Sequence, residues 1–148
     1  MIIAMAADHG GYELKNAIRD HLTAKGYQVA DLGTNSGESV DYPEYGYACG
    51  KAVAGGRAEL GIVCCGSGIG ISMAANKVPG VRCALVNSLE LAKLAKQHNN
   101  ANMLAFGGRF TAPEDAIAMV DAWLEEEWLG TTQERHARRV AQLNELGK

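Results

Sequence analysis

The sequence contains few cysteines, prolines and aromatic residues, and it has no long hydrophobic run. Its 148 residues include four cysteines and three prolines, and 6% of them are aromatic. No apolar stretch approaches the roughly 20 residues that a membrane-spanning helix needs. The cysteines show no Cys-x-x-Cys spacing, so the usual signature of zinc sites and of thioredoxin-like chemistry is missing. The net charge of -3 argues against a general nucleic-acid-binding protein.

These absences leave a single globular domain over residues 1–148 as the expected organisation. A hydrophobic content of 47% is sufficient for one packed core at this length. The apolar start, residues 1–7, has no basic segment and leads directly into Asp8, so it predicts a first strand and not a signal peptide. Cys64 and Cys65 are neighbours on a predicted strand and should point to opposite faces of the sheet. Reduced cysteines indicate a cytoplasmic protein.

Strand-like and helix-like segments alternate along the whole chain. Strands are predicted at residues 2–7, 27–32, 60–65, 82–86 and 103–106. Helices are predicted at residues 12–25, 43–54, 72–76, 88–97, 113–126 and 133–146. Such alternation is typical of βαβ units with a parallel sheet between two helical layers. The predicted fold class is therefore α/β, a Rossmann-like three-layer sandwich with a five-stranded parallel sheet.

The turn at residues 66–70 carries the strongest local signal for a functional site. The apolar strand 60–65 ends at Cys65, and a Gly-Ser-Gly-Ile-Gly turn leads from it into a helix. Glycines let backbone amides approach a ligand, and the helix N-terminus leaves further N–H groups unpaired. A thiol beside such donors suits a reaction in which negative charge develops. The turn matches neither the dinucleotide fingerprint nor the P-loop, so a tight connection with an inert buried cysteine is an equally good interpretation.

Ligands of parallel α/β sheets bind at the carboxyl ends of the strands. Polar residues and glycines follow most of the predicted strands, and we expect them along one edge of the sheet. They are residues 8–11, 33–34, 65–70, 87–88 and 107–109. His98, by contrast, follows a helix that runs back across the sheet, so it should lie at the opposite edge of its own subunit. It could join the site only from a neighbouring subunit or through a bend in the chain.

The last predicted helix differs from the others. Arg135 and Arg139 are four residues apart, share one helix face and can bind one phosphate together. The apolar stripe of this helix is narrow and follows two tryptophans, which suggests that residues 130–148 dock on another subunit. A solvated basic face is the more common meaning of such arginines. His136, in the same segment, is expected to face solvent.

Several separated stretches together resemble one family. They are residues 8–11 (Asp-His-Gly-Gly), 33–34, 41–43, 65–72, 75–77, 97–100 (Gln-His-Asn-Asn) and 104–109, with Arg135 and Arg139. The chain resembles the type B ribose-5-phosphate isomerases, a group that includes the galactose-6-phosphate isomerase subunits. The similarity covers nearly the whole chain in the same order. It implies interconversion of ribose 5-phosphate and ribulose 5-phosphate in the pentose phosphate pathway, without metal or cofactor, by a homodimer whose sites combine two chains.

The resemblance also implies roles for individual residues. Cys65 matches the family's base, which takes a proton from the carbon beside the carbonyl and so forms an enediolate. Ser67 matches a proton relay, and His98 matches the ring-opening acid–base, with Asp8 assisting. Donors to the enediolate are implied at Gly66, Ser67, Gly68, Ile69 and Gly70. Asp8 also belongs to the implied substrate-binding set, whose further members are His9, Asn99, Arg109, Arg135 and Arg139.

One position distinguishes two branches of the family. Ile71 stands where the other branch carries a glutamate as base, and isoleucine cannot take a proton, so Cys65 is the implied base here.

Other functions remain open at the level of sequence. Six-carbon substrates, allose 6-phosphate or galactose 6-phosphate, differ by one hydroxymethylene, and the deciding contacts lie in loops such as residues 33–42. A non-catalytic sugar-phosphate or nucleotide-binding module would use the glycine turn but has no use for Cys65 together with His98. A peroxide sensor would use Cys64 and Cys65, but no resolving partner is evident. Dimers could also pair into tetramers.

Overall fold

Short apolar strands build a five-stranded parallel sheet in the computed structural model, which describes residues 1–148. The strands are β1 (Ile2–Ala7), β2 (Gln28–Asp31), β3 (Leu60–Cys65), β4 (Cys83–Leu85) and β5 (Met103–Gly107). Their order in the sheet is β2-β1-β3-β5-β4, and every neighbouring pair is parallel. The central strands β1, β3 and β5 consist almost entirely of buried residues, because helices cover both faces of the sheet.

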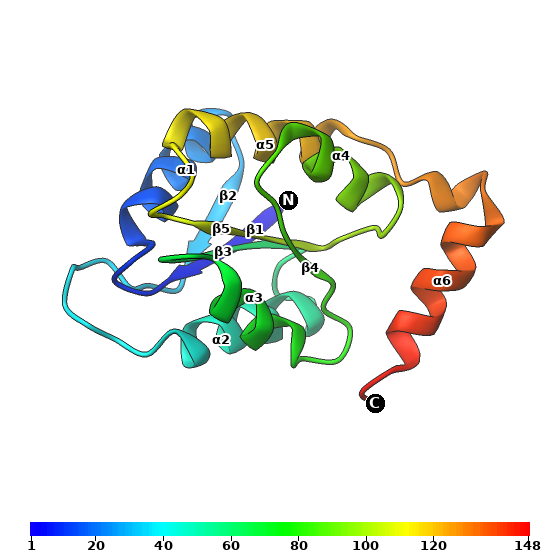
Figure 1. The fold of residues 1–148 in the computed structure, drawn as a ribbon, viewed down its shortest axis with the longest axis horizontal. Coiled ribbons are helices and arrows are strands. Elements are labelled where there is room, and N and C mark those ends of the chain that lie inside the picture. The colour runs from blue at the N-terminus through cyan, green and yellow to red at the C-terminus, as the bar shows by residue number, and fades with distance from the viewer.

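Six α-helices connect and follow the strands. They are α1 (Tyr12–Ala24), α2 (Tyr42–Ala54), α3 (Ile69–Asn76), α4 (Leu89–Gln97), α5 (Pro113–Glu125) and α6 (Glu134–Glu145). Helices α1, α4 and α5 cover one face of the sheet, and α2 and α3 cover the other (Figure 1). This confirms the predicted three-layer α/β class. None of these helices combines the length and the apolar character needed to cross a bilayer.

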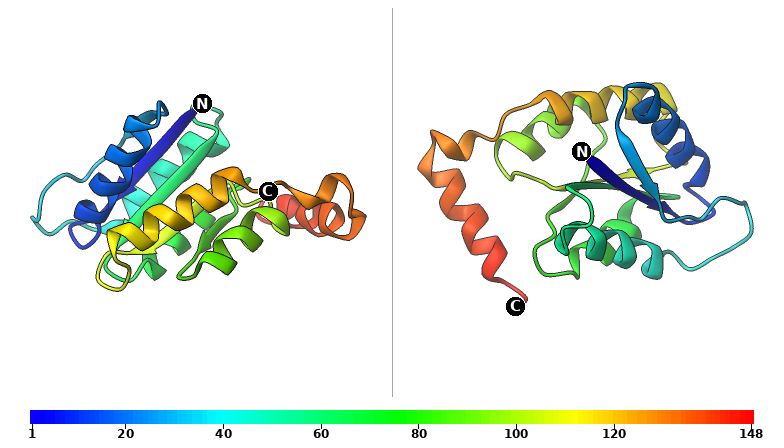
Figure 2. Two further views of the ribbon diagram at one scale, coloured as in Figure 1. Left: turned by 90° about the horizontal axis from the view of Figure 1, so that it is seen from above. Right: turned by 180° about the vertical axis from the view of Figure 1, so that it is seen from behind.

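The C-terminal helix α6 belongs to neither layer. A short 3-10 turn, Leu129–Thr131, leads out of the sandwich, and α6 then lies beside the sheet at one end of the molecule (Figures 1 and 2). Only His136 and Val140 of this helix are buried. Most of the surface of α6 is therefore open in the isolated chain.

Two cores lie on the two faces of the sheet. The core beneath α1, α4 and α5 contains Ile62, Cys64 and the fully buried Trp123, whose Nε1 donates to the carbonyl oxygen of Ala101 at 3.0 Å. The core beneath α2 and α3 contains Val63 and Cys65. Alternate residues of β3 thus face opposite layers, as the period of a strand requires. Cys64 and Cys65 accordingly point to opposite sides of the sheet.

The predicted elements agree with the structure apart from their ends. The largest shift is at α3, which begins at Ile69, inside the glycine turn, and not at Ser72. Gly68 is the residue before the helix and has φ 80°, a left-handed conformation that side chains other than glycine rarely adopt. The predicted cap of α4 is confirmed, since the Oγ of Ser88 accepts the N–H of Leu91 at 3.1 Å.

Candidate active site

The carboxyl ends of three neighbouring strands form one edge of the sheet. Ala7 of β1 lies opposite Cys64 of β3, and Cys65 lies opposite Gly107 of β5. The residues that follow these strands are therefore neighbours in space. Together they line a cavity of about 500 Å³, whose walls are Asp8, Tyr42, Cys65, Gly66, Ser67, Ile69, Gly70, Met73, Arg109 and Phe110.

Cys65 lies at the floor of this cavity, beside backbone donors. Its Sγ accepts the N–H of Gly68 at 3.1 Å, and the residue is only 4% exposed. The N–H groups of Gly66, Ser67 and Gly70 have no acceptor within the chain. A thiol next to unpaired amides and a helix N-terminus is a site where an anion is stabilised.

Ser67 is oriented by the same turn. Its Oγ accepts the N–H of Ile69 at 3.2 Å. Because the oxygen is the acceptor in this contact, the hydroxyl proton stays available for donation into the cavity.

Asp8 and His9 form the wall on the β1 side. The Oδ1 of Asp8 accepts the N–H of Gly10 at 2.8 Å, and the Asp8 residue is buried. The Nδ1 of His9 accepts the N–H of Val40 at 3.2 Å, so the neutral ring carries its proton on Nε2. A second cavity of about 650 Å³ lies between these two residues and residues 39–44.

Arg109 closes the β5 side of the cavity. A Cβ built on Gly66 would fall 2.9 Å from its Nη1, so the guanidinium lies directly over the glycine turn. A Cβ on Gly107 would fall 2.6 Å from the carbonyl oxygen of Ser67, which shows how closely the β3 and β5 loops pack. Glycine at these positions permits the approach that brings a cation to the amide donors.

The remaining predicted site residues lie elsewhere. His98 ends α4 and precedes β5, and the start of β5 pairs with Gly61, four residues before Cys65 on β3. That separation is about 13 Å along the sheet. Asn99 also lies at this far edge, and Arg135 and Arg139 are exposed on α6 without an ion-pair partner. One chain therefore brings together Asp8, His9, Cys65, Ser67 and Arg109, but not the second group.

His136 is not the solvent-facing residue that the sequence suggested. It is 5% exposed, and its ring stacks on that of His98 with centroids 4.3 Å apart and planes 12° from parallel. Burial and the positive charge of Arg135 lower the pKa of His136. The prediction was wrong because the packing partner of α6 is a loop about 35 residues earlier in the chain.

Arg82 fixes α6 relative to that loop. Its Nη2 donates to the carbonyl oxygen of Asn100 at 2.8 Å, and its Nη1 donates to the Oδ1 of Asn144 on α6 at 2.9 Å. A cavity of about 440 Å³ lies here, between α6 and residues 76–84. Neither Arg82 nor His136 stood out in the sequence, since no spacing rule connects residues so far apart.

Burial makes the other three thiols hard to ionise. It raises the pKa of Cys49 to about 12, and it raises the pKa of Cys64 and of Cys83 further still. These thiols stay protonated near neutral pH, and a protonated thiol is a poor nucleophile. The result argues against a peroxide sensor built on Cys64 and Cys65.

Three hydrophobic side chains of the cavity were not assigned from sequence. Tyr42 at the start of α2 packs over Gly70, where a built Cβ would fall 2.5 Å from its ring. Met73 and Phe110 form the rim and are 61% and 81% exposed. For Tyr42 the sequence left a place in the sugar pocket and a structural role equally open, because a tyrosine before a proline is common in both, whereas Met73 and Phe110 gave no signal.

The fold and the site define an α/β protein with an anion-binding pocket at the carboxyl edge of its sheet. The sequence model of the family described as Ribose/Galactose Isomerase matches residues 3–143. The chain is 46% identical over 138 residues to ribose-5-phosphate isomerase B of Escherichia coli K12, covering 93% of this chain and 91% of the relative. It is 42% identical over 141 residues to ribose-5-phosphate isomerase B of Mycobacterium tuberculosis H37Rv, covering 95% of this chain and 86% of that protein.

Solved structures give the same result. Ribose-5-phosphate isomerase B of Clostridium thermocellum superposes with a TM-score of 0.94 at 46% identity, over 99% of this chain and 97% of that one. The enzyme of Mycoplasma genitalium, solved with bound ribulose 5-phosphate, has a TM-score of 0.90 at 40% identity, over 97% and 93% of the two chains. The protein belongs to the ribose/galactose isomerase family.

Proposed function

We propose that the protein interconverts D-ribose 5-phosphate and D-ribulose 5-phosphate through an enediolate, without a metal ion. The names of its relatives support the reaction and the substrate. The observation that carries the proposal for this chain is the placement of the Cys65 Sγ, which lies in the cavity beside the unpaired amides of the glycine turn. A base and an anion-stabilising group are the two parts that such an isomerisation requires.

In this mechanism Cys65 acts as a thiolate on the open-chain aldose. The thiolate takes the proton from C2, the C2–H electron pair forms the C1=C2 bond, and the carbonyl electrons move onto O1. The amides of residues 66–70 stabilise the resulting enediolate. The Ser67 hydroxyl moves a proton between O2 and O1, and the Cys65 thiol returns its proton to C1, which gives the ketose. Substrate and product thus differ only in the position of hydrogen atoms.

Charged groups around the cavity suit the rest of a sugar phosphate. The Nε2–H of His9 and the guanidinium of Arg109 are donors for phosphate or hydroxyl oxygens. The Asp8 carboxylate can accept a hydrogen bond from a sugar hydroxyl and assist ring opening. We assign phosphate and hydroxyl binding to these three residues.

A second copy of the chain completes the site in this proposal. His98, as ring-opening acid–base, cannot reach the Cys65 of its own chain, and Asn99, Arg135 and Arg139 lie on the same far side. Exposed apolar residues surround the glycine turn, where a partner would cover them: Ile69, Met73, Leu85 and Phe110. Residues 130–148 protrude from the sandwich, and two of their arginines, Arg135 and Arg139, have no ion-pair partner. We therefore propose a homodimer in which this segment brings Arg135 and Arg139 to the partner's cavity, and the loop after α4 brings His98 and Asn99 to it.

The test is a chelator-treated assay of ribose 5-phosphate conversion beside allose 6-phosphate and galactose 6-phosphate. Preferred turnover of the pentose phosphate supports the proposal. Preference for a hexose phosphate would keep the mechanism and correct the substrate. Absence of turnover on all three, with a folded protein, would contradict the proposed activity.

Four free cysteines suit the reducing cytoplasm as the place of this reaction.

A further inference from the structure

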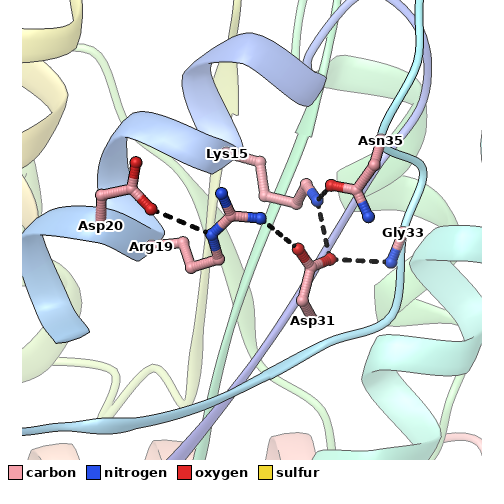
Figure 3. Close-up of polar contacts among 6 residues, drawn as sticks. All are labelled: Lys15, Arg19, Asp20, Asp31, Gly33 and Asn35. Carbon is pink, nitrogen blue, oxygen red and sulfur yellow. Dashed lines mark hydrogen bonds and ion pairs between the residues drawn. The ribbon is translucent and has the colours of Figure 1, made fainter.

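Helix α1 carries a lysine that is completely buried. Lys15 is 0% exposed, and its Nζ donates to the Oδ1 of Asp31 at 2.7 Å and to the Oδ1 of Asn35 at 2.6 Å (Figure 3). A buried ammonium group is costly unless anions or oxygen acceptors surround it. The two contacts join three separate parts of the chain, because Lys15 lies on α1, Asp31 ends β2 and Asn35 belongs to the loop that follows β2.

Asp31 is the centre of this cluster. Its Oδ1 also accepts the N–H of Gly33 at 2.9 Å, and its Oδ2 accepts the Nη1 of Arg19 at 2.8 Å (Figure 3). Burial alone would raise the pKa of Asp31, but the hydrogen bonds from Lys15, Gly33 and Arg19 outweigh it and lower the pKa. The carboxylate is therefore ionised and holds the start of the loop.

The end of the loop held in this way, residues 39–41, lines the second cavity together with Asp8 and His9, and Asp8 is shared with the cavity of Cys65. The N–H of Ala7 donates to the carbonyl oxygen of Gly33 at 2.6 Å, directly before Asp8. At the far end of the loop, Val40 donates to the Nδ1 of His9 at 3.2 Å. Residues 36–39 between these contacts are exposed and form no hydrogen bond to the rest of the chain. The path of the loop thus depends on its anchors, of which the Lys15–Asn35 contact is the last before the exposed segment.

We propose that Lys15 is a positioning residue for substrate binding, because its ammonium group anchors Asn35 and thereby places the loop 33–41 against His9. The proposal rests on the proposed function of the same site. It assigns Lys15 no contact with the substrate. Its loss should weaken binding of the phosphate or hydroxyl that His9 contacts, and should leave the proton transfers at Cys65 intact.

Asn35→Ala separates this role from a merely structural one. Asn35 is exposed and lies outside helices and strands, so the substitution leaves the Lys15–Asp31 pair and the core in place. Asn35→Asp keeps an oxygen acceptor for the ammonium group. Glu38→Ala, in the same loop and at a side chain that forms no hydrogen bond or ion pair, is the matched control. Lys15→Met removes the ammonium group at similar volume.

We expect Asn35→Ala to raise the KM for ribose 5-phosphate about fivefold with kcat within about twofold, the effect of one net hydrogen bond on binding. Asn35→Asp should restore the wild-type KM, and Glu38→Ala should not change it. The double variant Lys15→Met/Asn35→Ala should raise KM no more than Lys15→Met alone, because both substitutions remove the same contact between residues 15 and 35. An unchanged KM in Asn35→Ala, or additive effects in the double variant, would overturn the proposal. If Lys15→Met does not fold, the two Asn35 variants still decide it.

A second measurement does not depend on turnover. Amide hydrogen exchange of residues 36–41 should be faster in Asn35→Ala than in the wild type and should return to normal in Asn35→Asp. Unchanged exchange would overturn the proposal, and so would faster exchange with an unchanged KM, since the anchor would then not serve the substrate. Failure of the proposed function itself is recognised separately, as a wild-type protein without turnover.

Discussion

Cys65 differs from the other cysteines in what surrounds its sulfur. All four are free, and Cys49, Cys64 and Cys65 are buried, but only Cys65 lines the cavity at the glycine turn and accepts a backbone N–H at a helix N-terminus. Cys49 lies in the same core and has a pKa raised by burial to about 12. A matched pair of substitutions on one side of the sheet can therefore test the role of the thiol in turnover.

Cys65→Ala should lower kcat by about 10²–10⁴-fold, the usual contribution of a positioned base, and should leave the thermal unfolding temperature close to that of the wild type. The side chain is small, so little packing is lost. Cys49→Ala, assayed in parallel, should retain wild-type kcat. Steady-state kinetics and circular dichroism measure both effects. Full activity of Cys65→Ala would refute the assignment of Cys65 as base.

Site residues could be predicted from the sequence wherever a rule connects a residue to its own strand or helix. Asp8 and Arg109 follow strands and Cys65 ends one, and the rule that parallel strands end at one edge placed the three together. Lys15 lies on the buried face of α1 with Ile18 and Leu22, at spacings of three and seven, so a helical pattern could have indicated its burial. His136 could not be predicted in this way, because its burial depends on the path of residues 126–133 after α5.

At the level of elements, the network around Asp31 joins α1, β2 and the loop 33–41. The strands and helices were predictable from periodicity, since each has its own apolar pattern. The early start of α3 was not, because the glycines at 66, 68 and 70 predicted a turn through residue 70, whereas the helix begins directly after the left-handed Gly68. The ion pair of Lys15 and Asp31 could not be predicted from the sequence either, since it joins residues 16 positions apart on different elements.

Asp31→Asn should lower stability at pH 7 by about 3 kcal/mol, because the fully buried Lys15 ammonium loses its anion. The folded-state pKa of Asp31 lies below its ordinary value of 3.8. The carboxylate therefore stabilises the fold above about pH 4, and this contribution is lost as the pH falls through the folded-state pKa. Thermal unfolding measured between pH 8 and pH 2 should show a difference in stability between the wild type and Asp31→Asn. This difference should disappear only below pH 4.

A control for this series is Asp20→Asn, which removes an exposed partner of Arg19. It should change stability by less than about 0.5 kcal/mol at any pH. If the stability difference between wild type and Asp31→Asn stays constant down to pH 2, the substitution destabilises the protein by disturbing the packing and not by removing a charge.

At the level of the whole molecule, the sandwich separates the candidate groups into two sets. Cys65, Ser67 and Asp8 lie at the carboxyl edge of the sheet, and His98 lies at the opposite edge, stacked on His136 of α6. The apolar residues around the glycine turn remain exposed in the single chain. A dimer related by two-fold symmetry would bring the two sets together and cover these apolar residues. Each contact across its interface would occur twice, so two sites would form.

Shared sites predict complementation between inactive variants. Cys65→Ala and His98→Asn should each have little activity with ribose 5-phosphate, but a mixed dimer contains one site with an intact Cys65 and an intact His98. Each mixed dimer has one working site of two, so purified mixed dimers should have about half of the wild-type activity, and the unfractionated mixture, in which random assembly makes half of the dimers mixed, about a quarter. Co-expression with two different affinity tags, followed by tandem purification and assay, measures this. The matched control mixes Cys65→Ala with Ser67→Ala, which affect the same chain's half of the site and should not complement. If purified mixed dimers of the first pair have only the summed activity of the single variants, His98 does not act across the interface and the proposed division of the site is wrong.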